Sequence, residues 1–243
     1  SVDGNMNDCQ IAIGDIDIDV QKPLLESYAK KLNCELTRYQ DFRENKKVST
    51  YNIVNSKGDL NPLKELLREY DLIRNKHIPK DYLLNDRKTR LFLFAGLIDS
   101  DGGGAGSDKT YDYVTKLDSL KDDICFLARS LGYYVNCKQK NVNGTNYWRL
   151  LISGDFSDVP VRLERKKFKR EINKNPLVTG FKIESIGIDD YYGFEIDGDK
   201  RFMLGDFTVT HNTEFIKTLA KDGKRILLVL PYISVIRNKI ETD

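Results

Sequence analysis

The segment Phe94–Gly102, which reads Phe-Ala-Gly-Leu-Ile-Asp-Ser-Asp-Gly, constrains the fold more than any other stretch of this chain. Its apolar residues predict a short helix, and Ala95 and Gly96 give that helix a flat face that a second helix can approach closely. The glycine run that starts at the last position predicts the end of the helix. Asp99 and Asp101 then lie at the helix C-terminus, where carboxylates add to the negative end of the macrodipole. The segment therefore predicts a strongly negative helix end that is suited to a divalent cation.

These nine residues resemble the LAGLIDADG motif of homing endonucleases, with Phe94 in place of the first Leu and Ser100 in place of the second Ala. The resemblance implies that two such helices pack side by side on a pseudo-two-fold axis. It also implies that their terminal acids, Asp101 in this segment, bind the Mg²⁺ ions that cut the two strands of DNA. The alternative is a buried amphipathic helix that ends in a solvated Asp-Gly turn.

Composition limits the class of protein. The chain has 243 residues, of which 40% are hydrophobic and 31% charged, as in a globular protein of one large or two smaller domains. The formal net charge is only +2, so nucleic-acid binding would depend on local clusters of Lys and Arg. The four cysteines form no Cys-x-x-Cys pair, which makes a structural zinc site improbable and fits reduced thiols. We see no signal peptide and no membrane-spanning run, and therefore expect an intracellular protein that is neither secreted nor in a membrane.

The hydrophobic periodicity predicts elements on both sides of this segment. Before it we expect a strand at Gln10–Ile13, a helix at Lys22–Leu32, strands at Leu36–Phe42 and Thr50–Val54, a helix at Pro62–Tyr70 and a loop at Asn75–Pro79. After it we expect a strand at Tyr111–Thr115, a helix at Leu120–Leu131, a hairpin of Tyr134–Gln139 and Tyr147–Ile152 across Asn143-Gly144, and a helix at about Val159–Lys169. The second series repeats the first, and Ala29…Leu32 aligns with Ala128…Leu131.

The spacing of acids and lysines supports this internal repeat. Lys76 follows Asp3 by 73 positions, and Lys174 follows Asp101 by the same 73 positions. Asp3 is thus the candidate acid of a first motif whose helix would precede residue 1. The LAGLIDADG resemblance implies that Asp3 and Asp101 hold Mg²⁺, and that Lys76 and Lys174 position the attacking water or stabilise phosphate charge. Exposed loop lysines in a Lys-rich protein are the alternative.

The resemblance implies an α+β fold of two pseudo-symmetric αββαββα repeats, whose strands together form a saddle-shaped surface for double-stranded DNA. Basic and aromatic residues alternate along the predicted strands, as needed to enter a major groove. They are Arg38, Tyr39 and Arg43 in the first repeat and Lys138, Lys140, Tyr147 and Arg149 in the second. The basic run at residues 165–170 is a candidate for phosphate contacts, or it is a solvated helix face.

A second constellation lies near the end of the chain. Phe194–Leu204 predicts a hairpin around the turn Asp197-Gly198. Downstream, His211-Asn212-Thr213 resembles the C-terminal junction of an intein, in which Asn is the last intein residue, His precedes it, and Cys, Ser or Thr follows.

The intein resemblance implies a chemical role for each junction residue. The hydroxyl of Thr213 takes over the acyl chain, and the side-chain amide of Asn212 attacks its own carbonyl to form a succinimide. His211 polarises that carbonyl or protonates the leaving amine. The hairpin would be the C-terminal hairpin of the splicing (Hint) domain.

The residues after Thr213 read helix, buried parallel strand, helix, which resembles the start of a P-loop NTPase, such as a helicase, as the C-extein. We therefore expect three parts: an endonuclease at 1–183 with its first motif truncated, the end of the splicing domain at 184–212, and an α-β-α extein fragment at 213–243. The expected partners are double-stranded DNA and a missing N-terminal intein segment, and the expected state is a monomer. Two alternatives remain open: a DNA-binding remnant whose nuclease has decayed, and a fragment of an ATP-dependent helicase with an inert insertion.

Overall fold

The computed structural model describes residues 9–39, 47–58, 60–104, 110–168, 182, 184–185, 187–188, 196–199 and 201–211. The chain divides into two compact units, residues 1–181 and residues 182–243. Four of the predicted site residues, Asp3, Lys174, Asn212 and Thr213, lie outside the described residues, as does the predicted extein segment 213–243. The roles assigned to them stay predictions.

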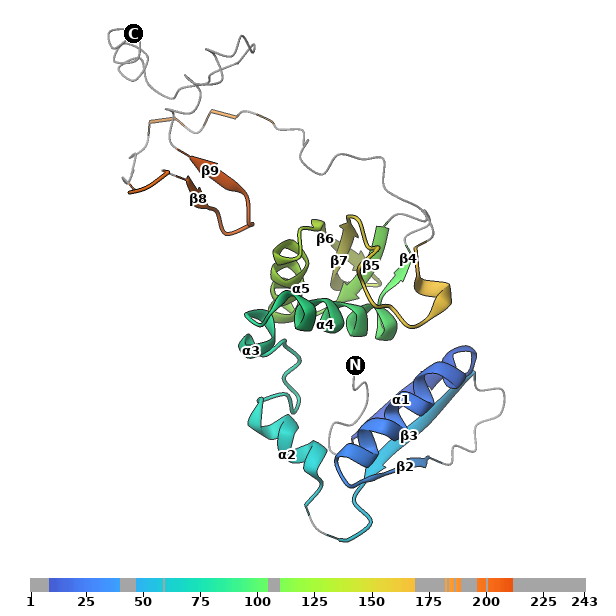
Figure 1. The fold of residues 1–243 in the computed structure, drawn as a ribbon. Helices are drawn as coiled ribbons and strands as arrows, with labels where there is room; N and C mark the ends of the chain where they lie inside the picture. Colours follow the sequence, from blue (N-terminus) through green and yellow to red (C-terminus); the bar gives the residue numbers. More distant parts are fainter. Residues whose placement is uncertain are drawn as a thin grey trace, which may run out of the picture. The chain divides into compact units, whose positions relative to one another are not determined.

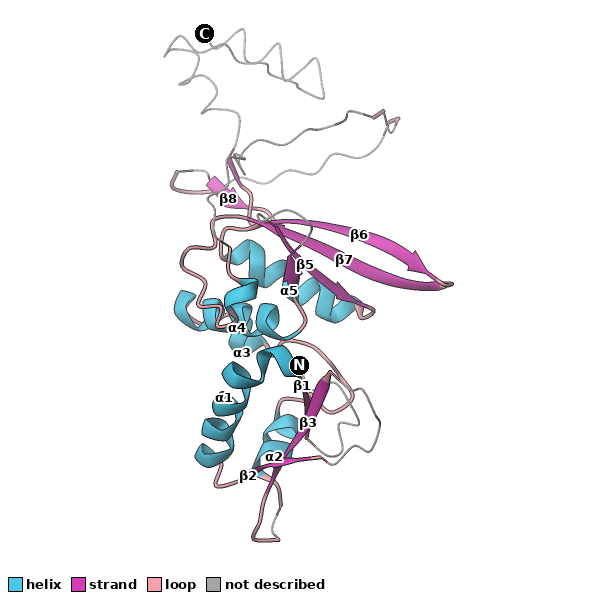
Figure 2. Cartoon of the chain, turned by 90° about the vertical axis from the view of Figure 1, so that its right-hand side faces the viewer, coloured by secondary structure: helices cyan, strands magenta, loops and turns pink. Residues whose placement is uncertain are grey.

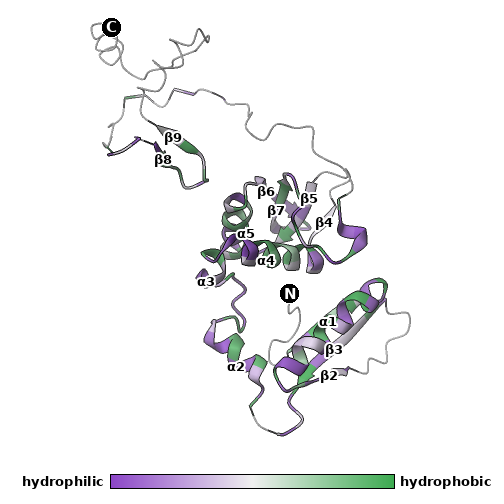
Figure 3. Ribbon diagram, in the orientation of Figure 1, coloured by the Kyte–Doolittle hydropathy of each residue, from purple (hydrophilic) through white to green (hydrophobic). Residues whose placement is uncertain are grey.

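The first half of unit one is a small sheet with a helix on one face (Figure 1). Its elements are β1 (Gln10–Gly14), the 3-10 turn η1 (Asp15–Asp17), α1 (Ile18–Lys31), β2 (Glu35–Arg38), β3 (Val48–Val54) and α2 (Pro62–Glu69). The strands are antiparallel and lie in the order β1-β3-β2. Asn61 caps α2 by accepting hydrogen bonds from the first turn of that helix. Figure 3 shows hydrophobic and hydrophilic residues interspersed along α1, as expected for a helix with one packed face.

The second half contains the segment from which the sequence argument began. Its elements are α3 (Lys80–Leu83), α4 (Arg87–Ser100), β4 (Gly103–Gly104), β5 (Thr110–Thr115), α5 (Asp118–Ser130), β6 (Tyr134–Val142), β7 (Thr145–Ser153) and η2 (Glu164–Lys166). The antiparallel strand order is β4-β5-β7-β6, and Figure 2 shows β5, β7 and β6 side by side. Asn143 and Gly144 both have positive φ, at 50° and 78°, which is the turn that a two-residue hairpin requires. The predicted hairpin is confirmed.

The internal repeat is confirmed in the topology. The series β1-α1-β2-β3 recurs as β5-α5-β6-β7, and the strand order β1-β3-β2 recurs as β5-β7-β6. Both helices end alike, because Asn33 and Gly132 have positive φ and the following amides return to the carbonyls of Ala29 and Ala128. The predicted alignment of these two alanines therefore holds. The described strands of unit one form two separate sheets, and one continuous saddle stays a prediction.

The helix predicted at about Val159–Lys169 was wrong. Over its described part the segment is extended and contains only the short turn η2. Val159, Val161 and Leu163 are buried in alternation, a period of two that belongs to extended chain, and Pro160 cannot donate a helical hydrogen bond. The basic residues in this stretch made the pattern look helical, but burial follows the strand period.

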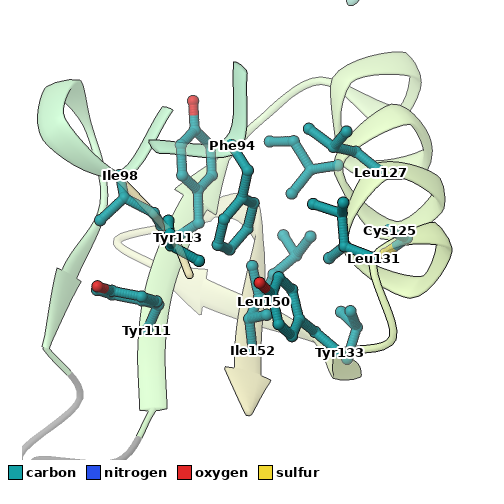
Figure 4. Close-up of a cluster of buried hydrophobic side chains, with 14 of the residues drawn as sticks. Phe94, Ile98, Tyr111, Tyr113, Cys125, Leu127, Leu131, Tyr133, Leu150 and Ile152 are labelled. Atoms are coloured by element: carbon teal, nitrogen blue, oxygen red, sulfur yellow. The ribbon is translucent and has the colours of Figure 1, made fainter. Parts of the chain in front are cut away.

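The main core lies between α4, α5 and one face of the second sheet (Figure 4). Phe94 is completely buried at its centre, with its ring 5.3 Å from that of Tyr133 and 6.2 Å from that of Tyr111. Ile98, Ile124, Leu127, Leu150 and Ile152 are also almost completely buried. Helix α4 is thus the central element of the core, so its C-terminus is held in a fixed place.

Unit two contains a short hairpin of β8 (Arg201–Met203) and β9 (Val209–His211). It differs from the hairpin predicted within Phe194–Leu204, because the chain reverses at Leu204–Thr208 instead. The positive φ of Gly198 is consistent with a turn at Asp197-Gly198, but residues 191–195 lie outside the described residues. In the part of the chain that the structure describes, no helix is both long and apolar enough to cross a membrane.

Truncation of Phe94 tests the position of α4 in the core. We expect Phe94→Ala to lower the free energy of unfolding by about 3–5 kcal/mol, because it leaves a cavity among packed rings. Phe92→Ala, on the same helix at 49% exposure, is the matched control and should cost less than about 1 kcal/mol. Urea unfolding followed by circular dichroism measures both, and equal losses would contradict this description of the core.

Candidate functional site

The C-terminus of α4 is a tight structure built from small residues. The amides of Asp101 and Gly102 both donate to the carbonyl of Leu97, which closes the last turn. A Cβ atom on Gly102 would lie 2.7 Å from the Cα of Ile98, so only glycine fits here without a shift of the backbone. The chain then leaves at once into β4. The glycine run that predicted the helix end therefore also allows the close return of the backbone.

The two carboxylates at this end have different surroundings. Asp99 is half-buried and accepts hydrogen bonds from the backbone amides of Arg162 and Leu163, each at 3.1 Å. Asp101 is exposed, and the hydroxyl of Tyr113 donates to it at 3.3 Å. Asp99 thus ties the following extended segment to the helix, whereas Asp101 is accessible to a ligand. This division of roles selects Asp101 as the candidate metal-binding acid.

A buried ammonium group caps the same helix end. Lys166 is only 8% exposed, and its Nζ donates to the carbonyls of Ile98 and Asp99 at 2.8 Å and of Ser100 at 3.3 Å. The last turn of α4 contains no basic residue of its own. The cation from η2 therefore binds the carbonyls that the helix leaves unsatisfied and offsets the negative end of its dipole. Burial, and then the neighbouring Arg165, lower the pKa of Lys166.

The turn that carries this lysine is fixed on two sides. The hydroxyl of Tyr111 donates to the carbonyl of Lys166 at 2.9 Å, and burial raises the pKa of Tyr111 to about 12. Arg165 makes a two-pronged ion pair with Asp17, at 2.8 and 2.6 Å. This pair lowers the pKa of Asp17, mainly through the hydrogen bond from Arg165. The bonds join the second half of the unit to the beginning of α1.

The prediction that the run 165–170 contacts phosphates is therefore wrong for Lys166, and for Arg165, whose side chain is 48% exposed, it stays a prediction. Lys166 is buried against the helix end, and Arg165 is paired with a carboxylate that is only 7% exposed. Residues 169 and 170 lie outside the described residues. A cluster of basic residues in a sequence does not reveal which of them are buried in the folded protein.

A cleft of about 470 Å³ opens between α1 and α4 and ends near the acids. Val20, Leu24 and Tyr28 line it from α1, and Ala95 and Gly96 line it from α4. Gly96 is exposed and no atom approaches the place of a missing Cβ within 4 Å. Asp17, Asp99 and Asp101 also line the cleft, and Gln21 of α1 reaches the carbonyl of Asp99 at 3.3 Å. Gly96 is thus open to the cleft, whereas Ala95 lines it with only 3% exposure, and the approach of a second helix to this face stays a prediction.

The metal ligands available near Asp101 suit a cation that takes most of its ligands from water and from substrate. Among the described residues, no group of three or more acidic, His or Cys side chains gathers to enclose a metal ion. Mg²⁺ is typically held by one or two carboxylates, with waters and substrate phosphates completing its octahedron. An exposed carboxylate at a negative helix end meets that requirement, but it does not make a complete metal cage.

The second sheet presents a basic face on the side away from the core. Tyr111, Tyr113, Leu150 and Ile152 point to the core, so the intervening residues of β5 and β7 point outward. The cross-strand register places Lys138 opposite Arg149 and Lys140 opposite Tyr147 on this outward face. Lys116 lies over the ring of Tyr147, 5.0 Å from its centroid. The four residues predicted for DNA contact in the second repeat thus share one face.

The first sheet differs from its predicted role. Arg38 pairs with Tyr51 and so shares the face that packs on α1, where its guanidinium donates to the hydroxyl of Ser49 at 3.1 Å. Tyr39, the next residue along, is 50% exposed. Consecutive strand residues point to opposite faces, so Arg38 and Tyr39 cannot both belong to one DNA surface. The prediction of one shared DNA surface for Arg38 and Tyr39 was therefore wrong, although Arg38 is exposed, and Arg43 lies outside the described residues.

Lys76 lies half-buried on the predicted polar loop between α2 and α3. This loop is tied to the second half of the unit, since the amide of Ile78 donates to the carboxylate of Asp123 on α5 at 2.8 Å. The structure thus confirms the loop and gives it an anchor. The catalytic role of Lys76 stays a prediction.

Comparison with known proteins gives partial similarities. No family model matches the chain. A part of 84 residues is 37% identical to the replicative DNA helicase DnaB of Mycobacterium intracellulare, and the match covers 35% of this chain and 14% of the helicase. The chain therefore spans a small fraction of the length of that relative.

Solved structures of the homing endonuclease I-DmoI resemble the fold in part. A mesophilic variant aligns with a TM-score of 0.44 at 14% identity, over 60% of this chain and 73% of its own. I-DmoI in complex with DNA and Mn aligns with a TM-score of 0.42 at 14% identity, over 59% and 73%. A variant in complex with its target DNA in the presence of Mg aligns with a TM-score of 0.42 at 15% identity, over 59% and 72%. At these values the likeness does not assign an activity to this chain.

The sequence did not indicate the roles that three residues have in this site, namely Lys166, Tyr113 and Asp17. One signal pointed to the first, because a helix that ends in two acids with no basic residue in its last turn requires a cation from elsewhere. Nothing in the local sequence indicated which of the many lysines supplies it. The partner of Asp17 is 148 positions away, and no periodicity relates residues so distant.

Lys166→Met tests the cap on α4. It removes three hydrogen bonds to helix-end carbonyls that remain buried, so we expect a loss of about 2 kcal/mol in the free energy of unfolding. Lys167→Met is the matched control, because Lys167 is exposed and forms a surface ion pair with the nearby Glu164, and it should change stability by less than about 0.5 kcal/mol. Thermal and urea unfolding provide the comparison. A Lys166→Met chain as stable as the control would show that the ammonium contributes no net stability.

Proposed function

We propose that this chain carries the DNA-binding and DNA-cutting part of an intein, a homing endonuclease that makes metal-dependent double-strand breaks. The observation that carries the proposal is Asp101, an exposed carboxylate at the end of a core helix whose small-residue face lines an open cleft. The sequence resemblance to the LAGLIDADG motif belongs to that same helix. In this proposal a second motif helix, ending at Asp3, packs against Ala95 and Gly96 and brings a second acid to the site.

The basic face of the second sheet supports double-stranded DNA as the substrate. Lysines that lie side by side with Arg149 repel one another until a polyanion neutralises them. The long β6–β7 hairpin has the dimensions that a two-stranded ribbon needs to enter a major groove. The two sheets repeat the same strand order, which supports a pseudo-two-fold arrangement. In that arrangement the second sheet contacts one half of the DNA site and the first sheet contacts the other half.

The roles of the residues follow from their surroundings. Asp101 would hold the cation and Tyr113 would orient Asp101, while Asp99 and Lys166 keep the helix end in shape. A bound Mg²⁺ would stabilise the charge that develops on the phosphate during hydrolysis. Lys76 and Lys174 would each contribute a compact positive charge near a scissile phosphate. A decayed, DNA-binding relative is the alternative, and only an activity measurement separates the two.

Asp101→Asn tests the endonuclease. In protein expressed from the complete coding sequence, we expect DNA cleavage to fall about a thousandfold, since a lost metal ligand removes several kcal/mol of transition-state stabilisation. Binding of DNA should stay within a few-fold, because Lys and Arg contacts to phosphate supply most of the affinity. Asp122→Asn, a carboxylate 70% exposed on α5, is the control and should cut normally. Undiminished cleavage by Asp101→Asn would overturn the assignment, and a wild-type protein that binds without cutting would favour the decayed nuclease.

We also propose that the bond between Asn212 and Thr213 is cleaved by protein splicing. The supporting observation is that β9 ends at His211, whose backbone is paired with Arg201, so an ordered strand leads directly into the junction. Attack of the Asn212 side-chain nitrogen on its own carbonyl carbon forms a succinimide and breaks the bond to Thr213. His211 would protonate the departing amine of Thr213.

The match to a replicative helicase supports a helicase-like extein after Thr213. At most 31 of the 84 matched residues can lie in 213–243, so most of the match lies before Thr213. The helicase therefore shares sequence with part of the proposed intein as well. This is expected if that helicase carries a related insertion. In this proposal Thr213 serves both as splicing nucleophile and as a residue of the phosphate-binding loop of the spliced host.

Asn212→Ala tests the splicing proposal. In the precursor made from the complete coding sequence, the change should abolish cleavage at residue 212, because alanine has no nucleophilic amide. His211→Ala should slow this cleavage without stopping it. Mass spectrometry of the products gives the readout, and the unmodified precursor should yield a fragment that begins at Thr213. A precursor that stays intact under folding conditions would reduce His211-Asn212-Thr213 to an ordinary turn.

A further inference from the structure

Arg149 and Asp112 form an ordered pair on the outward face of the second sheet. Asp112 lies on β5 and Arg149 on the neighbouring β7, where its direct cross-strand partner is Val114. The Nε of Arg149 lies 3.1 and 2.9 Å from the two carboxylate oxygens of Asp112, and its Nη2 lies 2.6 Å from one of them. The hydrogen bonds that Arg149 donates to Asp112 raise the pKa of Arg149. The carboxylate thus binds the guanidinium along the edge formed by Nε and Nη2.

The contact with Asp112 leaves one edge of the guanidinium available to a ligand. An arginine carries five N–H donors in a rigid plane, and the edge formed by Nε and one Nη is distinct from the edge formed by the two Nη atoms. Asp112 occupies the first edge. The second edge, formed by the two Nη atoms, lies at the far end of the side chain and is not occupied by Asp112. The Arg149 side chain retains 40% exposure. The pair therefore holds a two-donor fork with a fixed direction.

The residues around the Arg149–Asp112 pair indicate which kind of ligand the two remaining N–H donors can bind. Lys138 lies directly across from Arg149 on β6, and Lys140 and Tyr147 follow on the same face. Among the described strand residues of this face, Asp112 is the sole acid. Like charges placed opposite each other cost stability without a counter-charge, and one carboxylate offsets only part of that cost. The positive charge around Arg149 thus favours the binding of a polyanion next to this side chain.

We propose that Arg149 reads a guanine in the major groove of the target DNA, with Asp112 as the positioning residue that aims its guanidinium. The inference deepens the proposed DNA-binding function and rests on it. A two-donor fork matches the adjacent O6 and N7 acceptors of guanine, which no other base presents as a pair. Preorientation by Asp112 removes rotamer freedom that binding would otherwise have to remove. The carboxylate also disfavours a phosphate at this place, because it repels that anion.

Two simpler roles make different predictions. If Arg149 contacts a phosphate, its loss weakens binding to every sequence equally and reduces the salt dependence of binding. If the pair is only a surface ion pair, its loss changes neither affinity nor sequence preference, since exposed pairs contribute little. A guanine contact instead changes the preference at one position of the site.

Selection from a randomised double-stranded DNA library tests the inference. The full chain is bound to the library in a buffer with a chelator, so that no cutting occurs, and the enriched sequences are read for the wild type and three variants. The wild type should enrich a motif with guanine fixed at one position. Arg149→Lys keeps the charge but lacks the fork, so it should lose at least about tenfold of the guanine preference at that position alone. Asp112→Asn should relax the same position by a smaller factor while leaving the rest of the motif unchanged.

Lys138→Gln is the matched control, since it lies beside Arg149 and is expected to contact phosphate. It should weaken binding to all sequences and keep the motif, with a salt dependence lower by about one ion. Circular dichroism of each variant confirms that it folds. A motif identical in wild type and Arg149→Lys overturns this inference and leaves the proposed function standing. A wild-type chain that enriches no sequence overturns both.

Discussion

The buried ammonium of Lys166 on the C-terminus of α4 is the interaction on which the rest of the site depends. Helix α4 passes through the main core and ends in two carboxylates, so its last turn collects the dipole and two negative charges. Such an end is unstable unless a cation binds its carbonyls. Lys166 supplies this cation from 68 residues downstream of Ile98, and the extended segment that carries it is held by Asp99, Tyr111 and Asp17. The acids and the cation thus fold as one unit.

This arrangement separates the structural acid from the accessible one. Asp99 is used to bind backbone amides, which stabilise carboxylates well, and Asp101 is left at the surface beside Tyr113. A sequence with two acids one residue apart cannot by itself assign the two roles. The assignment depends on which acid faces the extended segment of Arg162 and Leu163, and here that acid is Asp99.

Much of the fold was predictable because it follows local rules. The helix of Phe94–Gly102, the hairpin at Asn143-Gly144 and the alignment of Ala29 with Ala128 each depend on short-range periodicity, turn geometry or helix-end geometry. The failures have equally definite causes. At Val159–Lys169 the run of basic residues obscured a burial period of two, and at Arg38 the strand register placed the side chain on the same face as Tyr51, opposite to that of Tyr39. Charge in a sequence shows that cations are present, but the face on which each one lies depends on register.

The sequence by itself determined the repeat, the helix that ends in acids and the glycines that stop it, because these are patterns of adjacent or regularly spaced residues. Only the tertiary structure decided that Lys166 serves the helix end, that Arg165 pairs with Asp17 and that Asp112 grips Arg149. These contacts join residues 67, 148 and 37 positions apart, respectively. The physical reason is that an ion pair of this kind is specified by the packing of whole elements against one another, and no local propensity carries that information.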